Sequence, residues 1–198
     1  MTNLADLNPQ VMRTPTWNAG KPGDCISGAI VSIEHDENID RYQKSKMIFT
    51  IRTMPANADG SAGLTHLPPR DAEGKVVKGY EASELVETSI GAEEDWRVYA
   101  NIAHNADGTT KDSILLQQLK KVPLYGVCKV NFKETKPSDY GNDAKIVEAL
   151  AYPSADGKGV MINEEVKAAA VEALTAIQST DTTPADAAAA EENRNKPF

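Results

Sequence analysis

The side chains with the clearest chemical potential are basic and aromatic residues that alternate with apolar ones along predicted β-strands. In residues 95–102, Trp96 and Val98 fall on one face, whereas Arg97 and Tyr99 fall on the opposite face. Such a strand buries its apolar face and leaves a cation beside an aromatic ring at the surface. Four further polar residues are predicted to project outward from other strands: Arg52, Lys129, Asn131 and Lys133.

Predicted loops beside these strands carry a second group of basic and aromatic residues. The group consists of Tyr42, Lys44, Lys46, Lys136 and Tyr140. An exposed aromatic ring can stack on any nucleobase, and lysine or arginine neutralises phosphate. The two groups together therefore favour a surface for single-stranded nucleic acid. Each residue alone also fits an ordinary solvated surface, so the interpretation requires that they lie on one sheet.

The sequence has no comparable pattern for catalysis or metal binding. None of its three histidines has a cysteine or histidine partner at a metal-ligand spacing. It shows no serine–histidine–aspartate grouping and no glycine-rich phosphate loop. We therefore expect neither an enzyme nor a bound cofactor or metal.

Composition predicts a folded protein with an uneven charge distribution. The 198 residues are 25% charged and 40% hydrophobic, which suits one ordinary domain with appendages. The net charge is −8, yet residues 111–147 hold seven lysines against four carboxylates, and residues 160–198 hold three cations against seven. An acidic tail on a locally basic domain differs electrostatically from a uniformly acidic protein. Because no signal-peptide pattern or membrane-spanning stretch is present, we expect a cytoplasmic protein without membrane contact.

Strand and helix signals predict a mainly β fold. Residues 23–34, 47–54 and 95–102 have strand patterns, a helix is predicted at 111–121, and two strands follow at 126–134 and 145–152. The first segment is apolar on both faces and has Gly28 at its centre, where a strand can bend at a barrel corner. Three strands, one helix and two strands is the element order of an OB-fold. We therefore expect a five-stranded OB-fold barrel over residues 22–153.

The remaining segments are predicted to be appendages of that barrel. Residues 1–21 form an N-terminal arm in which Trp17 plugs one end of the barrel. Residues 56–95 form a long insertion with several turn signals, a short strand at 76–77 and a short helix at 81–88. A C-terminal helix is placed in residues 154–178, and residues 179–198 are predicted to be a flexible, disordered acidic tail.

The two cysteines, Cys25 and Cys128, each lie inside a predicted strand. Buried reduced thiols are the expected state, because buried cysteines behave as small apolar residues. A disulfide between them remains open only if the two strands are neighbours.

Several of these segments together resemble phage-type OB-fold single-stranded DNA-binding proteins. They are Gly23-Asp24 at the first strand, Arg97-Val98-Tyr99 in the third, the intervening helix, and the strands at 126–130 and 145–152. The resemblance covers roughly residues 22–153. Independently, residues 191–198 look like the acidic tip of bacterial and phage single-stranded DNA-binding proteins, which often ends in Pro-Phe or another aromatic. Here Arg194 and Lys196 interrupt the acidic run.

The resemblance implies sequence-tolerant binding of single-stranded DNA, protecting it during replication or recombination, in the host cytoplasm if the protein is of phage origin. It also implies that Glu191, Glu192, Pro197 and Phe198 recruit replication or recombination proteins. The C-terminal helix is expected to dock on the domain or on a second copy, which leaves a homo-oligomer open. The alternative is a β-barrel virion or scaffold protein that makes protein–protein contacts. Salt-sensitive retention on single-stranded DNA would separate the two.

Overall fold

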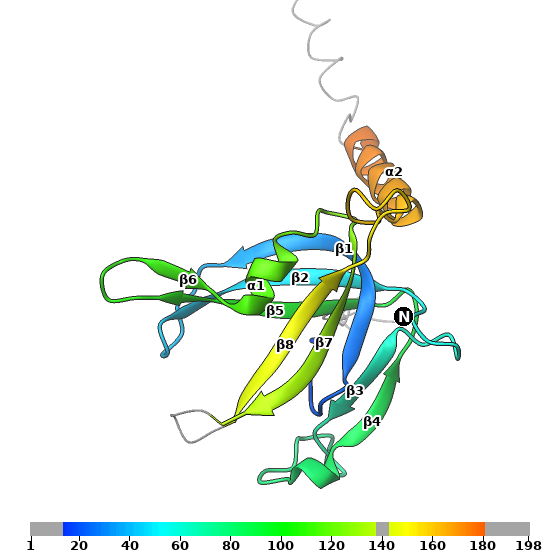
Figure 1. Cartoon of the computed structure of the whole chain (residues 1–198). Coiled ribbons are helices and arrows are strands. Elements are labelled where there is room, and N and C mark those ends of the chain that lie inside the picture. The colour runs from blue at the N-terminus through cyan, green and yellow to red at the C-terminus, as the bar shows by residue number, and fades with distance from the viewer. Residues whose placement is uncertain (1–13, 138–142, 181–198) are drawn as a thin grey trace, which may run out of the picture. The chain divides into compact units, whose positions relative to one another are not determined.

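The computed structural model describes residues 14–137 and 143–180, which form a mainly β structure with one large antiparallel sheet and two α-helices (Figure 1). The sheet has the strand order β6-β5-β2-β1-β7-β8, and β3 and β4 form a separate hairpin. The strands are β1 (Cys25–Asp36), β2 (Lys44–Thr53), β3 (Gly63–Leu67), β4 (Val86–Ile90), β5 (Asp95–His104), β6 (Thr110–Asp112), β7 (Val127–Lys136) and β8 (Ala144–Ala151). The helical segments are the 3-10 turn η2 (Ala82–Glu84), α1 (Ile114–Leu119) and α2 (Glu164–Thr180).

Strand β1 joins the two halves of the sheet. Residues 25–29 pair with β7, and residues 28–36 pair with β2, so that the two pairings overlap at Gly28 and Ala29. A Cβ atom at Gly28 would lie 2.1 Å from the Arg52 carbonyl oxygen, and glycine is therefore required for the close approach of β1 and β2. The curvature of β1 in Figure 1 agrees with the predicted bend.

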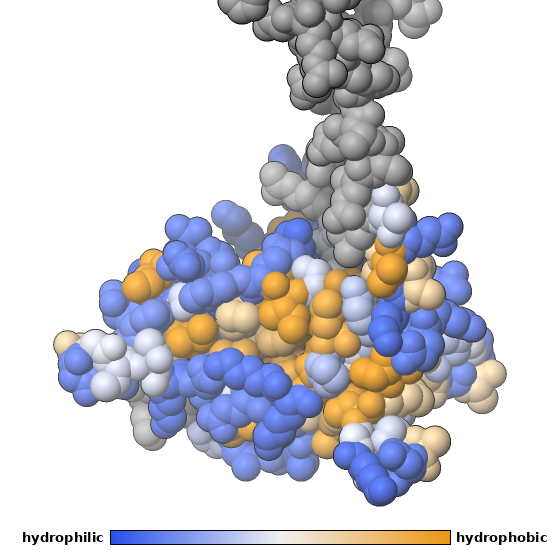
Figure 2. Space-filling view, turned by 90° about the horizontal axis from the view of Figure 1, so that it is seen from above, coloured by the Kyte–Doolittle hydropathy of each residue, from blue (hydrophilic) through white to orange (hydrophobic). Residues whose placement is uncertain are grey.

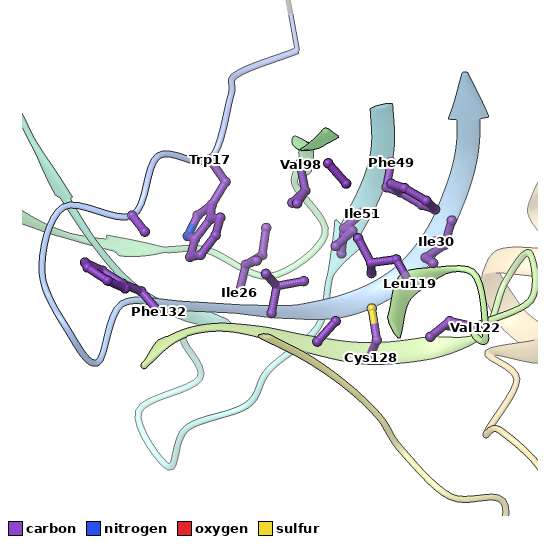
Figure 3. Packing of buried hydrophobic residues seen from close by; sticks show 14 of the residues in the cluster. Trp17, Ile26, Ile30, Phe49, Ile51, Val98, Leu119, Val122, Cys128 and Phe132 are labelled. Carbon is purple, nitrogen blue, oxygen red and sulfur yellow. The ribbon is translucent and has the colours of Figure 1, made fainter. Parts of the chain in front are cut away.

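A hydrophobic core lies between the strands and α1 (Figure 3). Alternate residues of β2, β5 and β7 point into it, as the alternation in residues 95–102 predicts for β5, and Leu116 and Leu119 of α1 are fully buried there. Trp17 is only 6% exposed and lies toward the same end of the cluster as Phe132. Trp17 is thus part of the core, although the closed barrel that it is predicted to plug does not form among the described residues. Burying each large apolar side chain stabilises the fold by ~1.5–3 kcal/mol.

The described part of the predicted N-terminal arm, residues 14–21, packs against the sheet. The backbone N–H of Trp17 donates to the Arg97 carbonyl at 2.9 Å, and the backbone N–H of Arg97 donates to the Pro15 carbonyl at 2.8 Å. Residues 15–17 thus add a short segment to the edge of β5. Residues 1–13 of the predicted arm lie outside the described residues.

The predicted five-stranded barrel does not form as a closed sheet. The large sheet has six strands, and no pairing joins β5 to β8 within residues 14–137 and 143–180. Other groups occupy part of this seam and satisfy the strand edges. The segment at residues 15–17 pairs with β5, and the Gln118 side-chain oxygen of α1 accepts the Ala149 N–H of β8 at 2.7 Å.

The predicted helix at 111–121 is too long at its N-terminal end. Residues 110–112 form β6 instead, because they pair with the end of β5 and extend that hairpin. The N-cap is Ser113, whose hydroxyl oxygen accepts the Leu116 N–H at 3.3 Å. Strand β5 correspondingly continues to His104, two residues beyond the predicted end.

The predicted helix at 81–88 is also wrong for most of its length. Only residues 82–84 are helical, and Val86–Ile90 forms β4, which pairs with β3. The β-branched residues at 86, 88 and 90 suit a strand once β3 supplies a partner. The short strand predicted at 76–77 is reduced to an isolated bridge between Arg70 and Val76.

Both cysteines are buried free thiols, as predicted. Their strands are neighbours, but Cys25 lies opposite Asn131 and Cys128 lies opposite Gly28, so the two residues are out of register. Burial raises the pKa of the Cys128 thiol to about 12. Cys128 is therefore a thiol, not a thiolate, at neutral pH.

A boundary between two compact units falls between Asn163 and Glu164. Residues 154–163 belong with the sheet, because Val160 bridges Pro153 and Ile162 bridges Gly126. The second unit contains α2, whose start at Glu164 lies inside the predicted range 154–178. None of the described helices has the length and apolar character needed to cross a membrane. Residues 181–198, which include the predicted partner-binding tip, lie outside the described residues.

Candidate nucleic-acid interface

The pairing of β2 with β5 brings several of the predicted site residues onto one face. Arg97 lies opposite Thr50, and Tyr99 lies opposite Ile48. Directly opposed residues of an antiparallel pair point to the same side of the sheet, and the alternate residues of both strands point into the core. The predicted residues on the outward face of β2 and β5 are Lys44, Lys46, Arg52, Arg97 and Tyr99.

Arg97 and Tyr99 have the properties of a binding pair. Both side chains are half-buried, and Arg97 forms no ion pair with any described residue. Its Nε atom is buried and has no hydrogen-bond partner in the described part of the chain. A buried donor without a protein acceptor is costly in a native structure, and here it belongs to a guanidinium whose charge no described carboxylate neutralises.

Arg52 differs from Arg97 because its charge is already neutralised. Its Nε and Nη2 atoms donate to the two carboxylate oxygens of Asp95 at 2.8 and 2.9 Å. These hydrogen bonds raise the pKa of Arg52 above its usual range. The structure therefore holds the predicted phosphate ligand Arg52 in a bidentate ion pair.

The predicted residues of β7 form a separate group, because β1 lies between β7 and β2 in the sheet. The Lys133 ammonium lies 3.5 Å from the Glu148 carboxylate, and the Lys136 ammonium lies 3.1 Å from the Glu134 carboxylate. Lys129 is half-buried opposite Leu150. Asn131 is half-buried opposite Glu148. Two of the three lysines in this group are thus paired with carboxylates.

Tyr42 lies in the loop between β1 and β2 and is 63% exposed. The Arg41 guanidinium lies over its ring, 4.7 Å from the ring centre, which leaves the other ring face free to stack. Lys44 and Lys46 follow at the start of β2, without ion-pair partners in the described residues. The last predicted loop residue, Tyr140, lies outside the described residues.

The seam between β5 and β8 contains two hollows of about 200 and 270 Å³, and a third of about 300 Å³ adjoins them between β5, β6 and α1. The first two share Tyr99, Leu115, Lys145 and Val147, and the last two share Asn101, Ser113 and Ile114. We call this continuous depression the seam groove. Its aromatic and charged lining residues are Trp17, Lys44, Tyr99, Lys111, Asp112 and Lys145.

The seam groove is basic although the chain as a whole is acidic. Its lining residues include three lysines and Asp112, whose carboxylate is paired with Lys120 at 2.5 Å. Ile114 adds a 63% exposed apolar surface. On the face seen in Figure 2, hydrophobic residues likewise reach the surface between hydrophilic ones. Cations beside apolar and aromatic surface are what a strand of stacked bases requires.

Lys145 and Lys111 are absent from the predicted set. Lys145 donates to the Ala19 carbonyl at 2.5 Å, and its ammonium lies 5.6 Å from the centre of the Phe132 ring. The sequence offers one indication that Lys145 is special. Along β8, Lys145 falls on the same face as Val147 and Ala149, which point into the core. A lysine with the parity of core residues is unusual, and this one remains exposed because it lies near the start of β8. Lys111 has no such signal, because its position depends on β6.

A buried polar cluster lies where residues 20–24 meet β3. The Asp24 carboxylate is fully buried and accepts the backbone N–H groups of Gly20, Lys21 and His66 at 2.6, 3.0 and 3.2 Å. It also accepts a short hydrogen bond from His66 Nδ1. Asp24 and His66 are 42 residues apart, and no local spacing predicts this contact.

Neither the models of known protein families, nor the curated proteins, nor the solved structures contain a match to this chain. Among the described residues, no group of three or more histidine, cysteine, aspartate or glutamate side chains is arranged to hold a metal ion. The geometry and charge of the outward face and the seam groove are thus the basis for the functional inference.

Proposed function

We propose that this chain binds single-stranded DNA without strict sequence preference, through the outward face of β2 and β5 and the adjoining seam groove. The observation that carries the proposal is the pair Arg97 and Tyr99. A half-buried guanidinium without a carboxylate partner among the described residues lies beside an aromatic residue that also lines the groove. A phosphate would neutralise the unpaired guanidinium charge, and a base would stack on the ring.

The topology supports an OB-type domain as the carrier of this site. Strands β1, β2 and β5 form one antiparallel run, α1 follows, and β7 and β8 return to the other side of β1. OB-folds are partly open barrels that bind oligonucleotides on the face of their second and third strands and on adjacent loops. In this chain the corresponding elements are β2, β5 and the loop that contains Tyr42.

Sequence tolerance follows from the kind of contacts that the site offers. Stacking and phosphate neutralisation are indifferent to base identity, because every base has a π-face and every nucleotide has a phosphate. The expected role is to cover and protect single strands during replication or recombination, including those of a phage. This role requires binding alone, and we propose no catalytic step.

The direct test is a titration of fluorescently labelled oligo-dT with the full chain at low and high salt, with a duplex of equal length as control. We expect tighter binding to the single strand. The logarithm of the binding constant should fall linearly with the logarithm of salt concentration, with a slope near −0.7 for each phosphate contacted. Absence of binding, or binding that does not change with salt, would reject the proposal.

The C-terminal tip is proposed to recruit partner proteins, with Pro197 and Phe198 inserting into an apolar pocket and Glu191 and Glu192 steering the approach. Deleting residues 191–198 should leave DNA affinity unchanged or raise it, because the tip is proposed to compete weakly with DNA for the basic surface. It should also abolish capture of replication proteins from the host cell. A deletion that lowers DNA affinity and retains every partner would contradict this role.

A further inference from the structure

A fourth hollow adjoins the seam groove beneath the β3–β4 hairpin. It has a volume of about 410 Å³ and shares Asn18, Ala19 and Lys145 with the neighbouring hollow of the groove. Its other walls include His66, Pro68, Tyr80 and Leu85. Ligand pockets typically measure ~300–1,000 Å³, so the space suffices for a small planar group. We call this space the hairpin hollow.

The walls of the hairpin hollow are held by buried contacts. The carboxylate of Asp24 binds backbone groups on both sides of the hollow, at Gly20 and at His66. The Thr65 hydroxyl donates to the Asn18 carbonyl at 3.1 Å. A Cβ at Gly20 would lie 2.5 Å from the His66 carbonyl oxygen, which shows how closely the two segments approach. The hollow is therefore preformed, which lowers the entropic cost of filling it.

The chemistry of this hollow suits a base better than a phosphate. Tyr80, Pro68 and Leu85 supply aromatic and apolar surface, and Tyr80 is 38% exposed. The hairpin and the turn before β4 also carry carboxylates. The Glu87 carboxylate lies 3.6 Å from His66 Nε2, and the Glu84 carboxylate accepts the Glu81 N–H at 2.6 Å. These carboxylates disfavour an anion beside the hairpin, whereas Lys145 supplies a cation to the lining of the hollow.

On the basis of the proposed function, we infer that the β3–β4 hairpin forms a terminal subsite for single-stranded nucleic acid. One base stacks on Tyr80 in the hairpin hollow, and the phosphate next to it lies at Lys145. The strand then continues from Lys145 past Tyr99 along the seam groove. This assigns a role to the long insertion at residues 56–95, as the wall that extends the groove by one nucleotide.

The experiment compares Tyr80→Ala with Tyr152→Ala in the full chain. Tyr152 is a matched control, because it is 36% exposed and lines none of the four hollows. Affinity is measured for oligo-dT of increasing length, from ~4 to ~16 nucleotides, the range of site sizes for one OB domain. The Tyr80→Ala variant should bind the shortest oligomers with wild-type affinity. It should bind the longest oligomers about fivefold more weakly, which corresponds to the smallest contribution expected from one stacked base.

Photocrosslinking provides an independent readout. An oligo-dT with 5-iodouracil at one terminus should crosslink to the peptide that contains Tyr80, and moving the label to the centre should shift the crosslink toward Tyr99. The subsite is overturned if wild type binds and Tyr99→Ala weakens binding, but Tyr80→Ala matches Tyr152→Ala at every length. A wild-type chain that binds no oligonucleotide overturns the subsite and the proposed function together.

Discussion

On the outward face of β5, Arg97 has no ion-pair partner in the described structure, whereas on β7 the ammonium of Lys133 lies 3.5 Å from Glu148. Both residues belong to strands that alternate apolar and basic side chains, and from the sequence the two strands look alike. They differ in what the neighbouring strand supplies. On β2, the residue opposite Arg97 is Thr50, which carries no charge. On β8, which pairs with β7, Glu148 lies within reach of Lys133.

This difference shows that the number of cations on a face is a poor guide to a nucleic-acid site. A lysine that is already paired must lose its partner before it can bind a phosphate, and an exposed ion pair contributes ~0–1 kcal/mol. The outward face of β2 and β5 contains both situations, because Arg52 is paired with Asp95 while Lys44, Lys46 and Arg97 are unpaired in the described residues. The proposed DNA surface therefore centres on the unpaired cations.

The largest effect is expected for Tyr99→Ala. Loss of one stacked base should weaken oligo-dT binding by ~1–3 kcal/mol, or about 5- to 150-fold. Tyr152→Ala, at a residue away from the groove, is the control. The measurement is fluorescence anisotropy at constant salt, with thermal unfolding to confirm that both variants fold. Equal affinities for the two variants would remove β5 from the DNA surface.

A smaller effect is expected for the double variant Lys44→Gln/Lys46→Gln. Removing two unpaired cations should weaken binding by about threefold to tenfold and reduce the steepness of the salt dependence by ~0.7 for each phosphate that is no longer neutralised. The matched variant Lys133→Gln/Lys136→Gln removes the same charge from paired positions and should change affinity less than twofold, since an exposed pair contributes little (~0–1 kcal/mol). If the second variant lowers the salt slope as much as the first, β7 belongs to the site.

The smallest effect, in the opposite direction, is expected for Asp95→Asn. The substitution frees Arg52 on the outward face and should raise oligo-dT affinity by about twofold at low salt, because one more cation can reach a phosphate. Because both side chains of the pair are about one-third exposed, little stability should be lost. The double variant Asp95→Asn/Arg52→Gln should abolish the gain. An unchanged affinity for the single variant would place Arg52 away from the DNA.

Local patterns predicted much of this structure because their causes are local. Residues 57–60 are Asn-Ala-Asp-Gly, a turn-forming run, and a turn forms there, with Gly60 at a φ of +83° and the Asp59 carboxylate accepting the Ser61 N–H at 2.9 Å. The turn at residues 105–108 repeats this geometry at Gly108. The strand at 95–104 likewise follows from alternation, which places Trp96 and Val98 toward the core and Arg97 and Tyr99 away from it.

The errors and omissions concern contacts between segments that are distant in the chain. Residues 86–90 could form either a helix or a strand, and β3, about twenty residues earlier, decided the outcome. The helix start moved to Ile114 because residues 110–112 found a partner in β5. The open seam likewise depends on where residues 15–17 and Gln118 contact the strand edges.

The sequence by itself therefore determined the mainly β character, the strand faces, the turns and the presence of basic and aromatic residues on outward faces. Only the tertiary structure decided which cations are available, since Arg52 and Asp95 are 43 residues apart and Lys145 meets Ala19 across 126 residues. Alternation and turn preference act within a few residues and can be recognised in any window of the sequence. Charge pairing and grooves depend on strand order and register, which long-range packing sets.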